Sequence, residues 1–229
     1  MPVYWLSEEI AEFPPPELAS ADGILAFGGD LSPERLLLAY QRGIFPWFNP
    51  DDPILWWSPD PRSVLFPAEL KVAKSMRPYF NQRKFETSYD RAFERVMRHC
   101  QKPRQGLGEG TWITEGMVDA YCQLYQLGFA HSVEVWQDGE LAGGLYGLSL
   151  GKCFFGESMF ANVGNASKFG FITLVRRLEE LGFWLVDCQQ QTKYLGSLGA
   201  RAIPRKDFLA ILKKNEQEKT LRGDWGRLL

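Results

Sequence analysis

The middle of the chain constrains the fold most, because it predicts three consecutive strands. Strand-forming residues at Ser132–Trp136 and from Leu141 onward flank the pair Asp138 and Gly139, which favours a two-residue hairpin turn. A third strand is predicted over Cys153–Phe160. Strands joined by such short turns pair with one another, so we expect these segments in one sheet.

Helical patterns lie on both sides of these strands. A helix is expected at Asp90–His99, and Thr114 predicts the N-cap of another helix, whose apolar face includes Tyr121. The segment Ala166–Leu181 has the apolar period of an amphipathic helix, which Gly182 ends. The order β-α-β-β-β-α-β is typical of an α+β domain with a mixed, open sheet. The remaining predicted segments are a strand at Phe85–Thr87, a strand that starts with the apolar run Phe183–Val186 and continues through Asp187 and Gln189, a short strand at Ala202–Ile203, and a helix at Lys206–Lys214.

The N-terminal part has a different character. Ser32, followed by Pro at the first turn, predicts a helix start, and Gly43 can end that helix in a left-handed conformation. The next segment, Ile44–Arg62, contains five prolines and three tryptophans and is expected to be a shaped loop rather than a helix or strand. We therefore predict a small N-terminal α/β domain at residues 1–62 and a larger domain at residues 63–229.

The composition is that of a globular protein. Hydrophobic residues make up 45% of the 229 residues and charged residues 24%. No apolar run approaches the roughly 20 residues that cross a bilayer, and the N-terminus lacks the pattern of a secretory signal. We therefore expect a cytoplasmic protein with no membrane partner. The four cysteines are isolated, which predicts buried thiols in place of a disulfide or metal site.

Positive charge is concentrated between Lys71 and Arg104. This segment carries ten Lys and Arg against three acidic residues, so its net charge is +7 and that of the remainder is -9. Such a split suggests a phosphate-bearing partner, although solvated helix faces would give the same pattern. The glycine-rich residues 106–110 that follow predict a mobile loop before Trp112.

Polar residues end the strand within LVDCQQQ, residues 185–191. Alternate residues of a strand share a face, so Asp187 and Gln189 are expected to point the same way and Cys188 the opposite way. The same rule aligns three residues of the preceding strand: Phe155, Glu157 and Met159. Carboxylates and an amide in this arrangement suit a reaction between an amine and a carbonyl. A pair of salt-bridged carboxylates at strand ends would look the same in the sequence.

Apolar and aromatic residues near these strands have two interpretations. Six side chains would form either a core stripe or a pocket for a Leu- or Phe-sized group: Leu145, Met159, Phe171, Leu174, Leu178 and Val186. Trp47 and Trp112 can stack on a splayed RNA base or simply pack. A GxSxG motif is absent and His131 lacks triad-like spacing, which argues against a serine or cysteine hydrolase.

Several motifs, taken in order, resemble the leucyl/phenylalanyl-tRNA–protein transferase family. They are FGGDLSPERLLLAYQRGIFPWF, ILWWSPDPR, EGTWIT, HSVEVW, GGLYG, FFGESMF, NASKFG, VDCQ and SLGA. The resemblance covers about Gly23 to Leu209, and WWSPDPR together with GESMF is highly specific. Gln190, Gln191 and Tyr194 are left without a role.

The resemblance implies a bacterial enzyme that moves Leu or Phe, and Met less well, from tRNA to the N-terminal Arg or Lys of a protein, which marks that protein for N-degron proteolysis. It also implies an acetyltransferase-like (GNAT) second domain. The implied catalytic residues are Asp187, Gln189 and Glu157. The implied side-chain pocket consists of the six apolar residues named above. The implied contacts to the terminal adenosine are Trp47, Trp112 and Phe154. The expected tRNA-backbone contacts are Lys71, Lys74, Arg77, Arg83 and Lys84.

The implied chemistry needs no metal or cofactor. The donor is an activated ester, and an α-amine with a pKa of about 7.7–8.0 has a useful neutral fraction. Positioning the amine against the carbonyl supplies most of the acceleration. We expect Asp187 to orient Gln189, and Gln189 to hold the amine.

Two alternatives remain. An acyl-CoA-dependent GNAT enzyme would carry an R/Q-x-x-G-x-G/A turn, which Asn162–Ser167 lacks. A non-catalytic aminoacyl-tRNA-binding module would need the aromatic and basic residues but not the polar strand ends. We expect a monomer, because nothing in the sequence signals a self-complementary interface.

Overall fold

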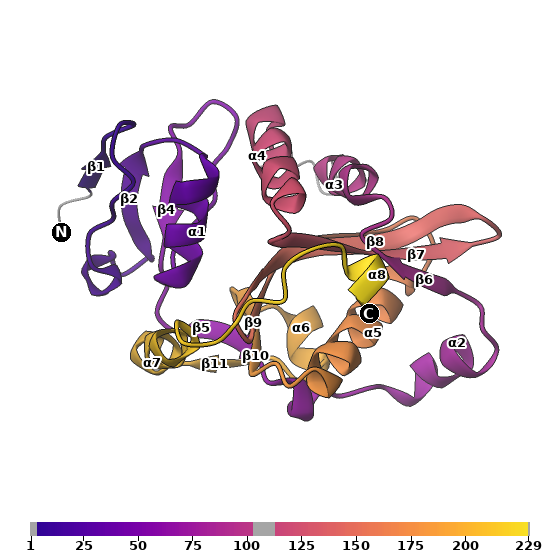
Figure 1. The fold of residues 1–229 in the computed structure, drawn as a ribbon. Coiled ribbons are helices and arrows are strands. Elements are labelled where there is room, and N and C mark those ends of the chain that lie inside the picture. The colour runs from indigo at the N-terminus through magenta and orange to yellow at the C-terminus, as the bar shows by residue number, and fades with distance from the viewer. Residues whose placement is uncertain (1–3, 103–112, 229) are drawn as a thin grey trace.

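The computed structural model describes residues 4–102 and 113–228. The predicted glycine-rich loop and Trp112 lie outside these residues. The described part forms two sheets with helices packed against them (Figure 1). No helix in residues 4–102 and 113–228 is long and apolar enough to cross a membrane.

The N-terminal sheet has four strands in the order β1-β2-β4-β3. The strands are β1 (Tyr4–Leu6), β2 (Ile24–Gly28), β3 (Phe45–Pro46) and β4 (Leu55–Trp57). The pair β1–β2 is parallel, and β2–β4 and β3–β4 are antiparallel. The prediction that Ile44–Arg62 contains no strand is therefore wrong. Local turn residues suggested a loop, but pairing with the distant β2 supplies the backbone hydrogen bonds of β4.

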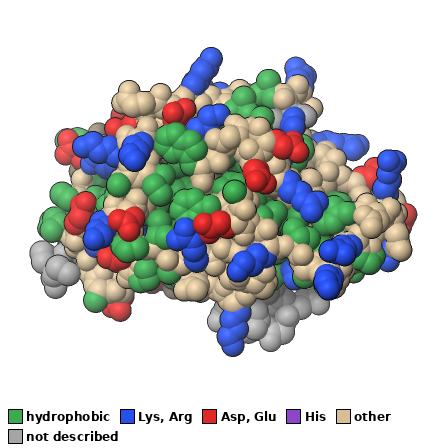
Figure 2. All heavy atoms as spheres, turned by 90° about the horizontal axis from the view of Figure 1, so that it is seen from below, with side chains coloured by type: hydrophobic (Ala, Val, Ile, Leu, Met, Phe, Trp, Pro, Cys, Tyr) green, Lys and Arg blue, Asp and Glu red, His purple; other side chains and the backbone are tan. Residues whose placement is uncertain are grey.

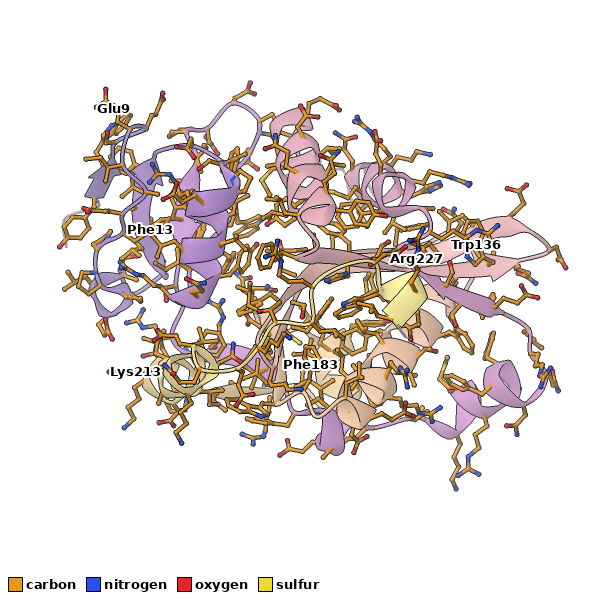
Figure 3. The ribbon with its side chains drawn as sticks, viewed as in Figure 1. Glu9, Phe13, Trp136, Phe183, Lys213 and Arg227 are labelled. Carbon is orange, nitrogen blue, oxygen red and sulfur yellow. The ribbon has the colours of Figure 1, made fainter. Side chains whose placement is uncertain are left out.

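The helix predicted after Ser32 is confirmed as α1 (Pro33–Gln41). The Ser32 hydroxyl accepts a hydrogen bond from the Arg35 N–H at 3.4 Å, which is the expected N-cap. Gly43 has φ 72°, as expected of the residue that ends such a helix. Buried Phe13 packs edge-on against Trp56 within this part of the molecule (Figure 3).

The second sheet has seven strands in the order β11-β5-β10-β9-β8-β7-β6. The strands are β5 (Arg62–Leu65), β6 (Glu86–Tyr89), β7 (Ala130–Gln137), β8 (Glu140–Leu150), β9 (Cys153–Ala161), β10 (Leu185–Gln189) and β11 (Arg201–Ile203). The pair β9–β10 is parallel and the other pairs are antiparallel. The predicted α+β class and mixed sheet are confirmed. The hairpin is confirmed too, with φ 52° at Asp138 and φ 81° at Gly139.

Helices cover both faces of the large sheet. The helices α3 (Phe93–Gln101) and α4 (Glu115–Gln126) lie on one face, and α5 (Ala166–Glu180) lies on the other (Figure 1). The remaining helices are η1 (Pro16–Leu18), η2 (Pro67–Glu69), η3 (Lys74–Met76), α2 (Arg77–Asn81), α6 (Lys193–Ser197), α7 (Arg205–Asn215) and α8 (Trp225–Leu228). Thr114 caps α4 through the Met117 N–H at 3.2 Å, as predicted.

Asp90 does not open the helix that we predicted at Asp90–His99. The residue has φ 57°, and its buried carboxylate accepts hydrogen bonds from the backbone N–H groups of Ser132 and Trp225, each at 2.8 Å. It also contacts His131 Nδ1 at 2.8 Å. Asp90 therefore ties the C-terminal segment to β7, which only the tertiary fold brings close.

One apolar cluster joins the two sheets. It contains Leu36 and Trp56 from the N-terminal part together with Val96 and Tyr121 from α3 and α4. A second cluster fills the α5 face. Because apolar contacts cross from one sheet to the other, the domain boundary at residues 62 and 63 stays a prediction.

Candidate active site

A cleft of about 1120 Å³ lies where the two sheets meet. Its walls come from Phe45–Trp47, the end of α3, the strands β8–β10 and the first residues of α5 and α6. All three predicted catalytic residues, Glu157, Asp187 and Gln189, line this cleft. The fold therefore brings together side chains that lie on two separate strands.

Asp187 is held by a buried arginine. The Arg62 guanidinium donates from Nε to Asp187 Oδ1 at 2.8 Å and from Nη2 to Oδ2 at 2.7 Å. Arg62 Nη1 also donates to the Gly43 carbonyl at 3.1 Å, and the guanidinium stacks on Phe45 and Phe208. A carboxylate with both oxygens engaged in this way is suited to positioning a neighbour rather than to taking a proton.

Gln189 is that neighbour. Its backbone N–H donates to Asp187 Oδ1 at 3.0 Å, and its φ is 53°. The pairing of β10 with β5 slips by one residue between Asp187 and Gln189, a β-bulge at Cys188. The period-two rule therefore does not relate the two side chains as we predicted, because a bulge interrupts alternation. Gln189 lines the cleft, and its Nε2 is buried with no hydrogen-bond partner among the described residues.

Glu157 lies on β9, within hydrogen-bonding distance of two buried tyrosines. The Tyr40 hydroxyl donates to Oε1 at 2.7 Å, and the Tyr121 hydroxyl donates to Oε2 at 3.1 Å. The two hydroxyls also lie within hydrogen-bonding distance of each other, but neither has a second proton to donate while both donate to Glu157. Burial raises the pKa of the Glu157 carboxyl to about 7, and the nearby charge of Asp187 adds to the rise, while the tyrosine hydrogen bonds oppose it.

A second bulge lies at Glu157, between Gly156 and Ser158. The register of β8 and β9 shifts between Tyr146 and Gly147, where β9 has one extra residue. Phe155 consequently belongs to the apolar cluster between the sheets, whereas Met159 packs on the α5 face. The predicted alignment of Phe155, Glu157 and Met159 on one face is wrong for this reason.

The six predicted pocket residues divide into two groups. The cleft is lined by four of them: Leu145, Met159, Phe171 and Val186. Leu174 and Leu178 are fully buried in the cluster on the α5 face and do not line it. The apolar stripe is therefore divided between the cleft and the core, because α5 presents one turn to the cleft and the next turns to the core.

The predicted adenosine contacts also divide. Trp47 is 38% exposed, lines the cleft and lies 5.4 Å from Trp57 between ring centroids. Phe154 is 1% exposed and packs 6.0 Å from Trp225 in the core. Phe154 precedes the bulge and faces α5, so it does not line the cleft, and we correct its assignment from ligand contact to core. Trp112 lies outside the described residues.

The predicted tRNA-backbone cations lie on the segment that runs from η2 to β6, and all five are exposed. They are Lys71, Lys74, Arg77, Arg83 and Lys84. None of them lines the cleft, whereas Lys102, next to α3, does. Figure 2 shows Lys and Arg side chains spread over the face of the molecule seen from below.

Sequence reasoning missed Arg62, Tyr40 and Tyr121. Arg62 is the last residue of the WWSPDPR motif, which was the available signal, but its burial and its partner depend on β10. Tyr121 fits the apolar period of α4, so the pattern placed it in the core correctly and concealed its hydroxyl. Tyr40 lies at the end of α1, whose packing against α4 the sequence does not specify.

Comparisons with known proteins agree over nearly the whole chain. Residues 64–213 match the family profile described as leucyl/phenylalanyl-tRNA protein transferase, and residues 29–60 match the N-terminal domain of that family. A protein of Myxococcus xanthus with the name leucyl/phenylalanyl-tRNA–protein transferase is 55% identical over 227 residues, which cover 98% of this chain and 97% of that protein. A protein of Desulforapulum autotrophicum with the same name is 51% identical over 225 residues, 98% of each chain.

Solved structures resemble the chain more distantly. L-PGS from Bacillus licheniformis has 12% identity and a TM-score of 0.42, over 84% of this chain and 64% of that one. A GCN5-related N-acetyltransferase from Kribbella flavida has 8% identity and a TM-score of 0.36, over 74% of this chain and 60% of that one.

Proposed function

Because this chain belongs to the leucyl/phenylalanyl-tRNA–protein transferase family, we propose that its cleft transfers Leu or Phe, and Met less well, from aminoacyl-tRNA to the N-terminal amine of a protein. The acceptor begins with Arg or Lys, and the product enters N-degron proteolysis. The observation that carries this proposal is the array of Arg62, Asp187 and Gln189 beside Glu157 in one cleft.

Peptide-bond formation needs an amine placed against an ester carbonyl. The amine nitrogen forms the C–N bond, the bond from the carbonyl carbon to the ribose oxygen breaks, and the ribose oxygen gains a proton as the nitrogen loses one. Gln189 holds the amine, and Asp187 fixes the Gln189 backbone through the 3.0 Å hydrogen bond. Orientation of this kind contributes several kcal/mol, up to about 7–11 kcal/mol in ideal cases.

Glu157 recognises the basic acceptor. Glu157 and Asp187 are the carboxylates among the described residues that line the cleft, and Asp187 is already paired with Arg62. An Arg or Lys side chain that enters the cleft therefore has Glu157 as its available counter-ion. This assignment gives Glu157 a role in binding the acceptor at the reacting centre.

The donor residue enters the apolar side of the cleft. Leu145, Met159, Phe171 and Val186 surround its side chain, with Leu174 and Leu178 supporting α5 from behind. Discrimination by one methylene is worth about 1–3 kcal/mol, so preference among Leu, Phe and Met is incomplete. Trp47 stacks on the terminal adenosine, and we extend this contact to Trp112.

The tRNA body contacts the exposed cations between Lys71 and Lys84, whose positive charge attracts phosphates. Aminoacyl-tRNA is used in the cytoplasm, so we place the protein there. We propose that the protein acts as a monomer.

One assay tests the proposal against both alternatives. Purified protein is incubated with Leu-tRNA and an Arg-initiated peptide, and the mass of the peptide is then measured by mass spectrometry. We expect the mass of one Leu to be added with charged tRNA, and no addition of an acyl group with acyl-CoA alone. Binding of charged tRNA without any transfer would contradict the proposal and favour the non-catalytic module.

A further inference from the structure

Tyr40, Tyr121 and Glu157 form a closed ring of hydrogen-bonding groups. Tyr40 Oη contacts Glu157 Oε1 at 2.7 Å, Tyr121 Oη contacts Glu157 Oε2 at 3.1 Å, and the two hydroxyls contact each other. Neither tyrosine is exposed to solvent. The ring joins α1 of the N-terminal part, α4 and β9, so it forms only when the two sheets are packed together.

The number of protons in this ring depends on Glu157. Three contacts need three protons if each is to be a hydrogen bond, and two hydroxyls supply two. A protonated carboxyl supplies the third, because Glu157 then donates to Tyr121, Tyr121 to Tyr40, and Tyr40 back to Glu157. With Glu157 ionised, both hydroxyls turn toward the carboxylate, and the contact between the two tyrosines is left without a proton.

The surroundings of the ring favour the protonated form in an empty cleft. The ionisable groups around Glu157 are Arg62 on β5, Tyr146 on β8, Asp187 and Cys188 on β10, and His99, Cys100 and Lys102 at the end of α3. Arg62, a buried cation that acts on Glu157, is already paired with Asp187. Burial and the Asp187 charge raise the pKa of Glu157 to about 7, in agreement with the proton count.

We propose that Glu157 carries a proton while the cleft is empty and releases it to water when the cationic side chain of an acceptor binds. Tyr40 and Tyr121 are positioning residues that form hydrogen bonds with Glu157 in both protonation states. The cation takes the place of the proton as the partner of the carboxylate, so charge balances at each step. Acceptor binding and proton release are thereby linked. This inference rests on the proposed function for the identity of the acceptor.

The first experiment measures the protonation of Glu157 without any substrate. The carboxyl carbons of Glu are labelled with ¹³C, and the Glu157 signal is assigned by its loss in Glu157→Gln and followed against pH by NMR. We expect titration near neutral pH. Tyr40→Phe and Tyr121→Phe should each move this titration, because each removes a hydroxyl that contacts the carboxyl and breaks the ring.

Tyr146→Phe is the matched control. Tyr146 is a buried tyrosine beside the cleft whose hydroxyl has no hydrogen-bond partner in the described part of the chain, so its loss should leave the Glu157 titration in place. Titration of Glu157 at the pH of an ordinary carboxyl would overturn the inference.

The second experiment measures proton release on binding. An Arg-initiated peptide is titrated into the tRNA-free protein by calorimetry, in buffers of different ionisation enthalpy, just below neutral pH. Wild-type protein should release up to about one proton more per bound peptide than Glu157→Gln does. Equal release by the two proteins contradicts the linkage. The Leu-transfer assay is run in parallel. If no Leu is transferred although Glu157 titrates near neutral pH, the proposed function is contradicted and the inference about Glu157 is not.

Discussion

The guanidinium of Arg62 donates hydrogen bonds to both carboxylate oxygens of Asp187, from Nε to Oδ1 at 2.8 Å and from Nη2 to Oδ2 at 2.7 Å. Neither side chain is more than 1% exposed. Asp187 in turn holds the backbone N–H of Gln189. Arg62 also reaches the Gly43 carbonyl and the ring of Phe45. One buried side chain therefore connects the N-terminal part of the chain to the residue proposed to hold the attacking amine.

Arg62→Ala should destabilise the protein by about 3–5 kcal/mol, because it leaves the Asp187 carboxylate buried and unpaired. Arg62→Lys keeps the charge but loses the two-pronged geometry, so it should lower kcat with a smaller loss of stability. Urea unfolding and the Leu-transfer rate measure the two effects. Arg201→Ala, which breaks an exposed pair with Glu69, is the control and should change neither.

Gln189→Ala should lower kcat for transfer about 100-fold, since the amine loses its positioning group. Asp187→Asn should also lower kcat, because the carboxylate that holds the Gln189 N–H is replaced. Binding of charged tRNA, measured by filter retention, should be retained in both variants. Unchanged turnover in either variant would refute the role assigned to that residue.

Leu174→Ala and Met159→Ala should have different effects. Leu174 is buried away from the cleft, so its truncation should cost about 2–5 kcal/mol of stability and leave the ratio of Leu to Phe transfer unchanged. Met159 lines the cleft, so its truncation should change that ratio by about tenfold or more. Competition between Leu-tRNA and Phe-tRNA measures the ratio, and an altered ratio in Leu174→Ala would contradict the assignment.

Removing Lys74 and Arg77 together should weaken the binding of every tRNA substrate alike. The slope of log K against log salt should become shallower by about 1.5 to 2, because two phosphate contacts are lost. Lys213 is an exposed cation on α7, at the opposite end of the view from α2 (Figures 1 and 3). Lys213→Ala should leave the slope unaltered. An unchanged slope in the variant that lacks both Lys74 and Arg77 would show that these two cations do not contact the tRNA phosphates.

The free energy of unfolding should depend on Glu157 as pH rises. The pKa of its carboxyl is raised from 4.5 to about 7 in the folded protein. The folded state therefore binds more protons than the unfolded state between these values. This contribution is fully present below about pH 4.5 and is lost as pH rises through about 7, by at most about 3 kcal/mol. Urea unfolding across this range should show a flatter profile for Glu157→Gln, and parallel profiles would contradict the shift.

The sequence by itself determined the elements whose signals are local. The turn at Asp138 and Gly139, the caps at Ser32 and Thr114 and the apolar period of α5 depend on neighbours within a few residues, so they could be predicted. The motifs that carry the family resemblance also placed Asp187, Gln189 and Glu157 together, and the structure puts all three in one cleft.

Only the tertiary structure decided how these residues are held. The two bulges, at Cys188 and Glu157, are responses of β10 and β9 to the strands beside them, and a bulge cancels the alternation on which prediction of strand faces depends. Phe154, which the resemblance assigned to the adenosine, lies in the core and not in the cleft. The partners Arg62 and Tyr40 lie more than a hundred residues from Asp187 and Glu157 in the chain. Arg62 meets Asp187 because β5 and β10 pair within one sheet, and Tyr40 meets Glu157 where the two sheets pack together, and no local pattern encodes either contact.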